Sequence, residues 1–194
     1  KGQKLVITDV QKQAKKKPSP GLYDLTELQR DANKRYGFSA KETLNIMQRL
    51  YEHHKVLTYP RTDSRYIGSD IVPTIKERLK ACNIGPYKAY IPALLKAPIR
   101  TSKAFVDDKK VSDHHAIIPT EEYVQLDHMS NEERKIYDLV VRRFISVLYP
   151  AYEYEQTTMK AAVQTSMQTF AKPSVATAVF GAKGQIVLKE GWKA

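Results

Sequence analysis

The most informative stretch of the chain is Thr58-Tyr59-Pro60-Arg61-Thr62-Asp63-Ser64. It places a phenol, a guanidinium, a carboxylate and hydroxyls on a segment that Pro60 keeps out of a helix. Proline also favours extended backbone angles for the residue before it, Tyr59. Side chains on an extended backbone repeat with a period of two, so Tyr59 and Arg61 are expected to point the same way. The stretch predicts a loop that presents a tyrosine beside an arginine.

This pair of side chains suits chemistry on a phosphate. A phenol titrates near 10, so ionising Tyr59 at neutral pH costs about 4 kcal/mol. A fixed guanidinium such as Arg61 lowers that cost and also neutralises charge on an attacked phosphodiester. The same residues also fit a tyrosine that packs in a turn beside a surface arginine, and the spacing alone does not separate the two interpretations.

Helix signals on both sides of the loop predict a mainly helical segment over residues 22–150. The helix before the loop leads directly into it, and its apolar stripe, which includes Tyr51, is expected to face a core. Two helices are expected before the loop: one capped by Asp24 or Thr26 that ends at Tyr36 before Gly37, and one opened by the capping box Ser39-Ala40-Lys41-Glu42 that runs to about His54. After the loop, a helix capped by Ser69 or Asp70 is expected to run to about Cys82, and a short one to span 86–96. The last is opened by the capping box Ser130-Asn131-Glu132-Glu133 and stops at Pro150.

The two ends of the chain have β patterns. Residues 1–11 alternate as a strand does, and 12–20, with three consecutive lysines and two prolines, has the composition of a linker. The expected strands after 151 are 157–165, 174–181 and 185–190, with a turn at Lys183-Gly184. We therefore expect an α+β fold, in which a mainly helical tyrosine-bearing domain, 22–150, is inserted between β segments, 1–21 and 151–194, of a second, incomplete β domain.

Three stretches resemble the type IA DNA topoisomerases, in particular the topoisomerase III branch. Residues 56–67 are similar to the active-site segment of that family, and 23–30 with 36–44 are similar to the helices that lead to it. The stretch Asp113-His114-His115-Ala116-Ile117-Ile118-Pro119-Thr120 is similar to its second active-site motif. The stretches occur in the order of the family and cover about residues 20–150. The chain resembles an internal fragment that carries the tyrosine domain and part of the hinge β domain.

The resemblance implies an enzyme that cleaves and rejoins single-stranded DNA through a 5′-phosphotyrosine intermediate and changes DNA topology by strand passage, without a nucleotide cofactor. Tyr59 takes the position of the nucleophile and Arg61 that of the partner of the scissile phosphate. His114 takes the position of the phosphate-proximal histidine, and a histidine can donate to a phosphate or relay a proton. In many relatives the next residue is acidic, whereas here it is a second histidine. The candidate DNA contacts are Arg61, Arg65, Thr62, Ser64 and His115.

Relatives also use Mg²⁺, which an acidic toprim domain holds in the family. The sequence has no D-x-D cluster, and the pair Asp107-Asp108, followed by two lysines, has the pattern of a solvated loop. We therefore expect no metal ligands in this chain. Its partners are expected to be the missing toprim and remaining domains of the same polypeptide, without which the piece should cleave DNA poorly or not at all.

Composition favours a polyanionic partner. The 194 residues include 32 Lys and Arg against 21 Asp and Glu, a formal charge of +11, which suits single-stranded or negatively supercoiled DNA. Cys82 is the only cysteine, so disulfides within the chain and thiolate zinc sites are excluded, as expected for a cytoplasmic protein. The chain has no apolar run long enough to span a membrane.

Two other classes of protein compete with the topoisomerase interpretation. A noncatalytic helical module that binds single-stranded DNA would need Tyr59 only as a packed side chain. A relaxase-like endonuclease would combine a tyrosine with a histidine-rich metal site, but that chemistry requires a His-apolar-His order and the chain has His114-His115-Ala116.

Overall fold

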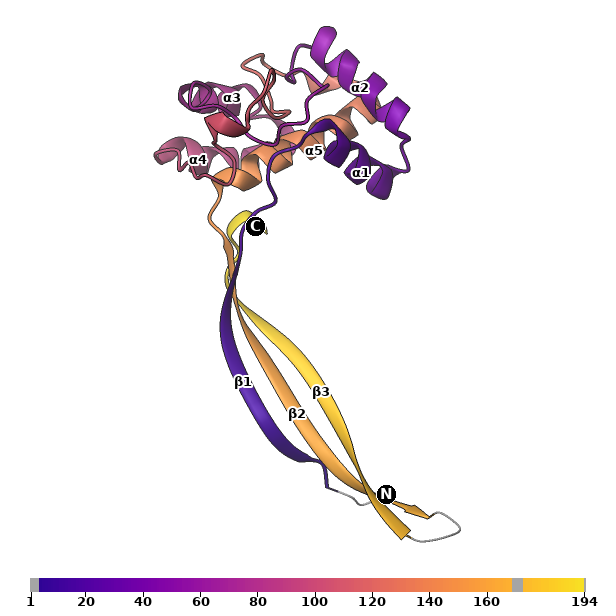
Figure 1. Cartoon of the computed structure of the whole chain (residues 1–194). Coiled ribbons are helices and arrows are strands. Elements are labelled where there is room, and N and C mark those ends of the chain that lie inside the picture. The colour runs from indigo at the N-terminus through magenta and orange to yellow at the C-terminus, as the bar shows by residue number, and fades with distance from the viewer. Residues whose placement is uncertain (1–3, 169–172, 194) are drawn as a thin grey trace. The chain divides into compact units, whose positions relative to one another are not determined.

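The structure of the chain, a computed structural model, describes the backbone of residues 4–168 and 173–193 and the side chains of 4–164 and 177–193. The fold is α+β. The chain divides into two compact units, of which one comprises 19–150 and the other 1–18 with 151–194. The first unit holds the helices α1 to α5 and the second holds the strands β1 to β3 (Figure 1). None of the helices within the described residues combines the length and apolar character needed to cross a membrane.

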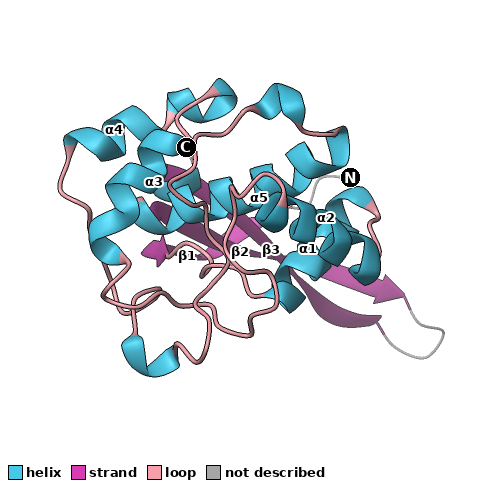
Figure 2. Ribbon diagram, turned by 90° about the horizontal axis from the view of Figure 1, so that it is seen from above, coloured by secondary structure: helices cyan, strands magenta, loops and turns pink. Residues whose placement is uncertain are grey.

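Residues 19–150 form a helical unit around one long helix. Its α-helices and short 3₁₀ helices are α1 (Leu25–Tyr36), α2 (Ala40–Glu52), η1 (Val72–Thr74), α3 (Ile75–Ala81), η2 (Gly85–Ala89), α4 (Ile91–Lys96), η3 (Asp108–Lys110), η4 (Leu126–His128) and α5 (Asn131–Leu148). Helices α1 and α2 pack together at one end of the unit, α3 and α4 lie at the other, and α5 lies between them (Figure 2). The hydrophobic core is built along α5. The buried side chains of this helix are chiefly Ile136, Tyr137, Leu139, Val140, Val141, Phe144 and Leu148.

Local caps fix the ends of the three longest helices. The Asp24 side chain accepts from the Glu27 N–H at 2.6 Å, and Gly37 ends α1 with a φ of 74°, a backbone conformation that glycine adopts without a side-chain clash. Both capping boxes form, with Ser39 at the start of α2 and Ser130 at the start of α5. The prediction of these three helices is confirmed.

The helices between the tyrosine loop and α5 differ from the prediction. Neither Ser69 nor Asp70 caps a helix; the chain makes a 3₁₀ turn first, and α3 begins only at Ile75. The Ser69 N–H donates to Asp108 Oδ1 at 2.6 Å instead. The predicted helix at 86–96 is two pieces, η2 and α4. Pro92 has no N–H to bond to a preceding turn, so it starts a new helix instead of continuing one.

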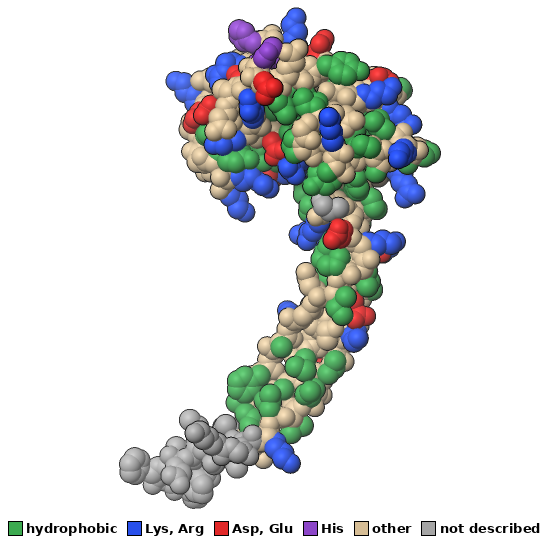
Figure 3. All heavy atoms as spheres, turned by 180° about the vertical axis from the view of Figure 1, so that it is seen from behind, with side chains coloured by type: hydrophobic (Ala, Val, Ile, Leu, Met, Phe, Trp, Pro, Cys, Tyr) green, Lys and Arg blue, Asp and Glu red, His purple; other side chains and the backbone are tan. Residues whose placement is uncertain are grey.

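The second unit is a three-stranded antiparallel sheet in the order β1-β2-β3, formed by β1 (Val6–Lys17), β2 (Tyr152–Gln168) and β3 (Pro173–Lys189), with a short 3₁₀ helix, η5 (Gly191–Lys193), after it. Cross-strand ion pairs join its strands, with Lys16 Nζ at 3.1 Å and Lys189 Nζ at 3.7 Å from the Glu153 carboxylate. Large apolar side chains lie exposed along the strands (Figure 3). They are Leu5, Val6, Ile7, Val10, Val179, Phe180, Ile186, Val187 and Leu188.

Two predictions about this unit are wrong. Residues 12–17 are not a linker but belong to β1, and residues 1–3 of the predicted strand 1–11 lie outside the described residues. No turn occurs at Lys183-Gly184, because these residues pair with Thr158 and Thr157 of a continuous β2. In both cases pairing with β2 supplies backbone hydrogen bonds that override the local composition.

Candidate active site

The tyrosine loop and the second predicted motif pair through their backbones. Leu57 and Pro119 form an antiparallel bridge. The Thr58 N–H donates to Ile118 O at 3.0 Å and the Thr120 N–H donates to Val56 O at 3.0 Å. Two segments about 60 residues apart in the sequence are therefore held side by side immediately before Tyr59.

Thr58 strengthens this pairing with its side chain. Its hydroxyl donates to Ala116 O at 3.2 Å and accepts from the Ile118 N–H at 3.0 Å. The 116–118 segment is fully buried, and its Ile117 N–H donates to Tyr23 O at 2.9 Å. All three stretches that carry the family resemblance thus meet at one place, with the second motif in the middle.

Tyr59 lies between two other rings. The centroid of its ring is 4.2 Å from that of His114, with an interplanar angle of 35°. On another side, the centroid of Tyr51 is 5.5 Å away and its ring is nearly perpendicular, at 83°. Tyr59 is half-buried, whereas His114 is exposed. The structure therefore brings the predicted nucleophile and the predicted phosphate-proximal histidine into contact, and it adds an aromatic neighbour that the sequence had assigned to the core.

Exposure alternates along the loop after Tyr59. Arg61 and Asp63 are exposed, whereas Thr62 and Ser64 are buried, at 7% and 5% exposure. This period of two is that of an extended segment, as the proline predicted. Arg61 forms no salt bridge with the described residues, so no carboxylate among them neutralises its guanidinium.

The buried hydroxyls of the loop bond to protein backbone. The Thr62 hydroxyl donates to His114 O at 3.0 Å and accepts from the Ser64 N–H at 3.1 Å. The Ser64 hydroxyl donates to Lys110 O at 2.8 Å. Thr62 thus links the loop directly to the residue that contacts Tyr59. In this arrangement both side chains support the loop, and a contact of either with DNA stays a prediction.

The two other candidate DNA contacts, Arg65 and His115, are half-buried and bond to backbone carbonyls. Arg65 is half-buried, and its Nε donates to Leu22 O at 3.1 Å. The His115 Nδ1 lies 2.7 Å from Ala116 O, an acceptor, so this nitrogen carries the proton and Nε2 is left as an acceptor in the neutral ring. Burial lowers the pKa of His115 below its usual range, which favours that neutral form at physiological pH.

Arg78 is a residue of this site that the sequence did not indicate. It is only 6% exposed and donates from Nη1 to Pro119 O at 2.8 Å and from Nε to the Thr74 hydroxyl at 2.8 Å. Its Nη2 lies 2.9 Å from the Glu121 carboxylate. The guanidinium holds the far end of the second motif against α3. An arginine at an ordinary position of a short amphipathic helix carries no sequence signal for such a role.

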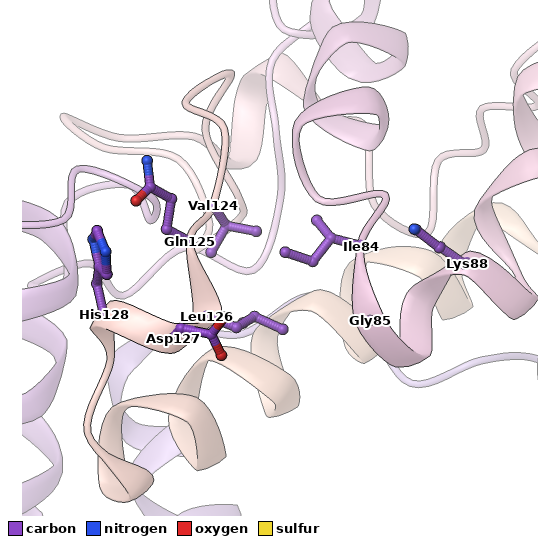
Figure 4. A pocket seen from close by; sticks show the side chains of 8 residues that line it. All are labelled: Ile84, Gly85, Lys88, Val124, Gln125, Leu126, Asp127 and His128. Carbon is purple, nitrogen blue, oxygen red and sulfur yellow. The ribbon is translucent and has the colours of Figure 1, made fainter.

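Two surface pockets of the helical unit could bind a ligand. One, with a cavity volume of about 630 Å³, adjoins Tyr59 and includes Tyr51, Lys55 and His115 in its lining. The other lies between η2 and η4, where the apolar side chains of Ile84, Val124 and Leu126 converge and the polar side chains lie around them (Figure 4). Only the first combines ionisable side chains with the predicted nucleophile.

Within the described residues, no group of three or more His, Cys, Asp or Glu side chains is placed to hold a metal ion. The carboxylate near the loop, Asp63, accepts a hydrogen bond from the Ser112 hydroxyl at 3.3 Å. These residues do not form a Mg²⁺ site by themselves, so no chemical step is assigned to a metal held by them.

Comparison with known proteins identifies the family. The model of the DNA topoisomerase family matches residues 1–194. The chain is 58% identical over 191 residues to DNA topoisomerase 3 of Bacillus cereus, an alignment that covers 98% of this chain and 25% of that protein. It is 52% identical over 193 residues to DNA topoisomerase 3 of Bacillus subtilis, covering 100% and 25%.

The fold is also similar to a solved structure, that of full-length topoisomerase I from Thermotoga maritima. The TM-score is 0.61 at 22% sequence identity, over 97% of this chain and 29% of that chain. The chain spans about a quarter of the length of the curated relatives it matches. The match of the family model over all of its residues shows that the chain belongs to the DNA topoisomerase family, as a type IA, topoisomerase III-like member.

Proposed function

We propose that Tyr59 is the nucleophile of a type IA topoisomerase and that this chain is the tyrosine-bearing part of a longer polypeptide. The phenol oxygen forms a bond to phosphorus of single-stranded DNA while the bond from phosphorus to the 3′-oxygen breaks. The phenol loses its proton and the leaving 3′-oxygen gains one. The product is a 5′-phosphate on Tyr59 and a free 3′-hydroxyl, whose return reverses the reaction after strand passage without a nucleotide cofactor.

The observation that carries this proposal is the contact between the Tyr59 and His114 rings, 4.2 Å apart, on two segments whose backbones are bonded to each other. In this proposal His114 donates to a phosphate oxygen or moves a proton at the reacting atoms. Arg61 supplies a positive charge two residues from the nucleophile. A fixed cation stabilises both the ionised phenol and the charge that develops on the attacked phosphate.

The same proposal includes parts outside this chain. The Mg²⁺ that the family uses would be held by acidic residues of a toprim domain elsewhere in the polypeptide. The β unit would belong to a larger hinge domain. The many large apolar side chains exposed on its strands support this assignment, because soluble proteins seldom leave such a surface uncovered. Single-stranded or negatively supercoiled DNA suits the charge of +11, and a lone, buried Cys82 suits the reducing cytoplasm.

The test uses the complete polypeptide with Mg²⁺ and single-stranded oligonucleotides labelled at either end, quenched with denaturing detergent. We expect the 3′-labelled piece to remain on the protein and Tyr59→Phe to abolish this, while Tyr123→Phe, at a tyrosine that is 73% exposed and outside the site, changes nothing. Retention of the 5′-labelled piece would mean the opposite polarity of attack. Binding of the oligonucleotides with no covalent product would favour the noncatalytic DNA-binding module.

A further inference from the structure

A groove begins at the Tyr59 ring and runs along the end of α2. Its lining includes Tyr51, Lys55, Thr58, His115 and Thr120 as well as Tyr59, and its cavity volume of about 630 Å³ falls within the range of small-molecule sites, about 300–1,000 Å³. The paired segments 56–58 and 118–120 contribute Leu57, Thr58 and Thr120 to its lining. The groove is therefore a built feature of the fold at the place where the nucleophile lies.

Tyr51 offers an aromatic surface in this groove. It lies in the last turn of α2, where it contacts Tyr59 nearly at right angles and stays 38% exposed. A ring held by a neighbouring ring loses little further freedom when a ligand binds to it. Stacking of an unpaired base on such an aromatic side chain is a common mode of single-strand binding, and it tolerates any base because each has a flat face.

Lys55 has an unusual backbone. Its φ is 57°, and no other non-glycine residue in the described part of the chain has a positive φ. Glycine would adopt this conformation without strain, whereas a residue with a side chain does so at a cost. Hydrogen bonds hold it there: the Thr120 hydroxyl donates to Lys55 O at 2.6 Å, and the Val56 N–H donates to Leu50 O at 3.0 Å.

The side chain of Lys55 is exposed and forms no salt bridge with the described residues, although Glu52 also lines the groove. A strained lysine where glycine would be unstrained indicates that its ammonium has a use. A lysine that lines the same groove as a tyrosine that takes up a phosphate can bind the next phosphate of the same strand with its ammonium. The carboxylate of Glu52 repels phosphate, so of the two charged residues at this end of the groove only Lys55 attracts it.

We propose that this groove binds the nucleotide on the 3′ side of the scissile phosphate, with its base stacked on Tyr51 and its following phosphate bound by Lys55. The inference rests on the proposed function. If the 5′-phosphate is bonded to Tyr59, the nucleotide that carries this phosphate must lie within one nucleotide's length of Tyr59. It adds to that function a binding site for the retained strand, formed by the end of α2.

The test of stacking compares an intact oligonucleotide with one that is abasic at the nucleotide immediately 3′ of the cut. In the complete polypeptide with Mg²⁺, we expect Tyr51→Ala to lower the amount of covalent complex about tenfold on the intact strand and to have no effect on the abasic strand. Tyr51→Phe keeps the ring and should behave as the wild type. Tyr123→Ala, which removes an exposed ring elsewhere, should change neither strand. An equal loss on both strands with Tyr51→Ala would overturn the assignment of the base.

The test of phosphate binding uses Lys55→Gly, which removes the charge and suits the positive φ. The variant should be at least as stable as the wild type in urea, so a loss of DNA affinity cannot be attributed to misfolding. We expect affinity for single strands to fall and the slope of log affinity against log salt to drop by about one, with Lys55→Arg retaining both and Lys76→Gly serving as an exposed-lysine control. An unchanged affinity and slope in Lys55→Gly would overturn the assignment of the phosphate.

Measuring the affinity for the intact and abasic strands, with and without the Tyr51 and Lys55 changes, in a Tyr59→Phe background separates the two proposals. If the protein with Tyr59 forms no covalent complex, the proposed function fails. The difference in affinity between intact and abasic strands, and the difference between Lys55→Gly and the protein that keeps Lys55, still support or overturn the nucleotide site on their own.

Discussion

Replacement of Arg78 tests whether the second motif depends on a buried brace. In Arg78→Met the long apolar stem is kept and the guanidinium is lost. Pro119 O and the Thr74 hydroxyl then each lose a donor at 2.8 Å. The pair with Glu121 counts for little, because the carboxylate side chain is 45% exposed and such pairs contribute about 0–1 kcal/mol.

The magnitude follows from these contacts. A hydrogen bond from a charged donor contributes about 1.5–3 kcal/mol, and the buried carbonyl of Pro119 left unpaired adds to the loss. The Thr74 hydroxyl still donates to Ile71 O, so its share is smaller. Burial disfavours the charged guanidinium and lowers the pKa of Arg78. Because Arg78→Met removes this buried charge, the lost desolvation cost offsets part of the loss in stability. We expect Arg78→Met to lower the free energy of unfolding by about 3 kcal/mol.

Urea unfolding of the 194-residue chain, followed by circular dichroism, measures this loss. Arg78→Lys should fall between the wild type and Arg78→Met, because a lysine keeps the charge but not the planar fork of donors. Arg30→Met is the matched control: the Arg30 side chain is 73% exposed and 3.6 Å from Glu27, so the change should cost less than about 0.5 kcal/mol. A result for Arg78→Met within the range of this control would refute the reasoning.

Three further changes test polar and ionisable side chains of the helical unit. Thr62→Val should lower the free energy of unfolding by about 1–3 kcal/mol, because His114 O and the Ser64 N–H lose their partner, whereas Asp63→Ala, at an exposed position of the same loop, should change it by under about 0.5 kcal/mol. Glu133→Gln, at a buried carboxylate 2.8 Å from Arg49, should cost about 1–3 kcal/mol in urea. Burial lowers the pKa of His115, so between the folded pKa and the unfolded value near 6.5 unfolding takes up a proton. Stability should therefore fall as the pH drops through 6.5 toward the folded pKa, and unfolding curves of His115→Gln should show less of this fall.

The parts of the fold that could be predicted are those that short-range chemistry decides. The side chains of Asp24, Ser39 and Ser130 bond to backbone three residues ahead, and Gly37 ends a helix with its own φ. The extent of a strand depends on a partner far away in the sequence. Composition therefore gave wrong predictions, a linker at residues 12–17 and a turn at Lys183-Gly184, because β2 supplies the hydrogen bonds at both places.

The site divides in the same way. Tyr59, Arg61 and His114 could be named because a motif carries them, and the structure brings Tyr59 and His114 into contact. Arg78 and Tyr51 could not, because their importance comes from contacts that the chain makes only after folding. Arg78 reaches a carbonyl 41 residues away, and Tyr51 turns toward the tyrosine loop from a stripe that the helical period assigned to the core.

The way the loop is built separates its stability from its chemistry. The half-buried Thr58 and the buried Thr62 and Ser64 bond mainly to backbone of the second motif and of the loop that precedes it, so they hold the loop whether or not DNA is present. Arg61 of the loop and His114 of the second motif are instead exposed. Substitutions on the exposed side should therefore alter cleavage with little loss of stability, whereas substitutions on the buried side should unfold the loop first. Paired backbones of this kind would hold the proposed nucleophile, Tyr59, in place without help from a bound strand.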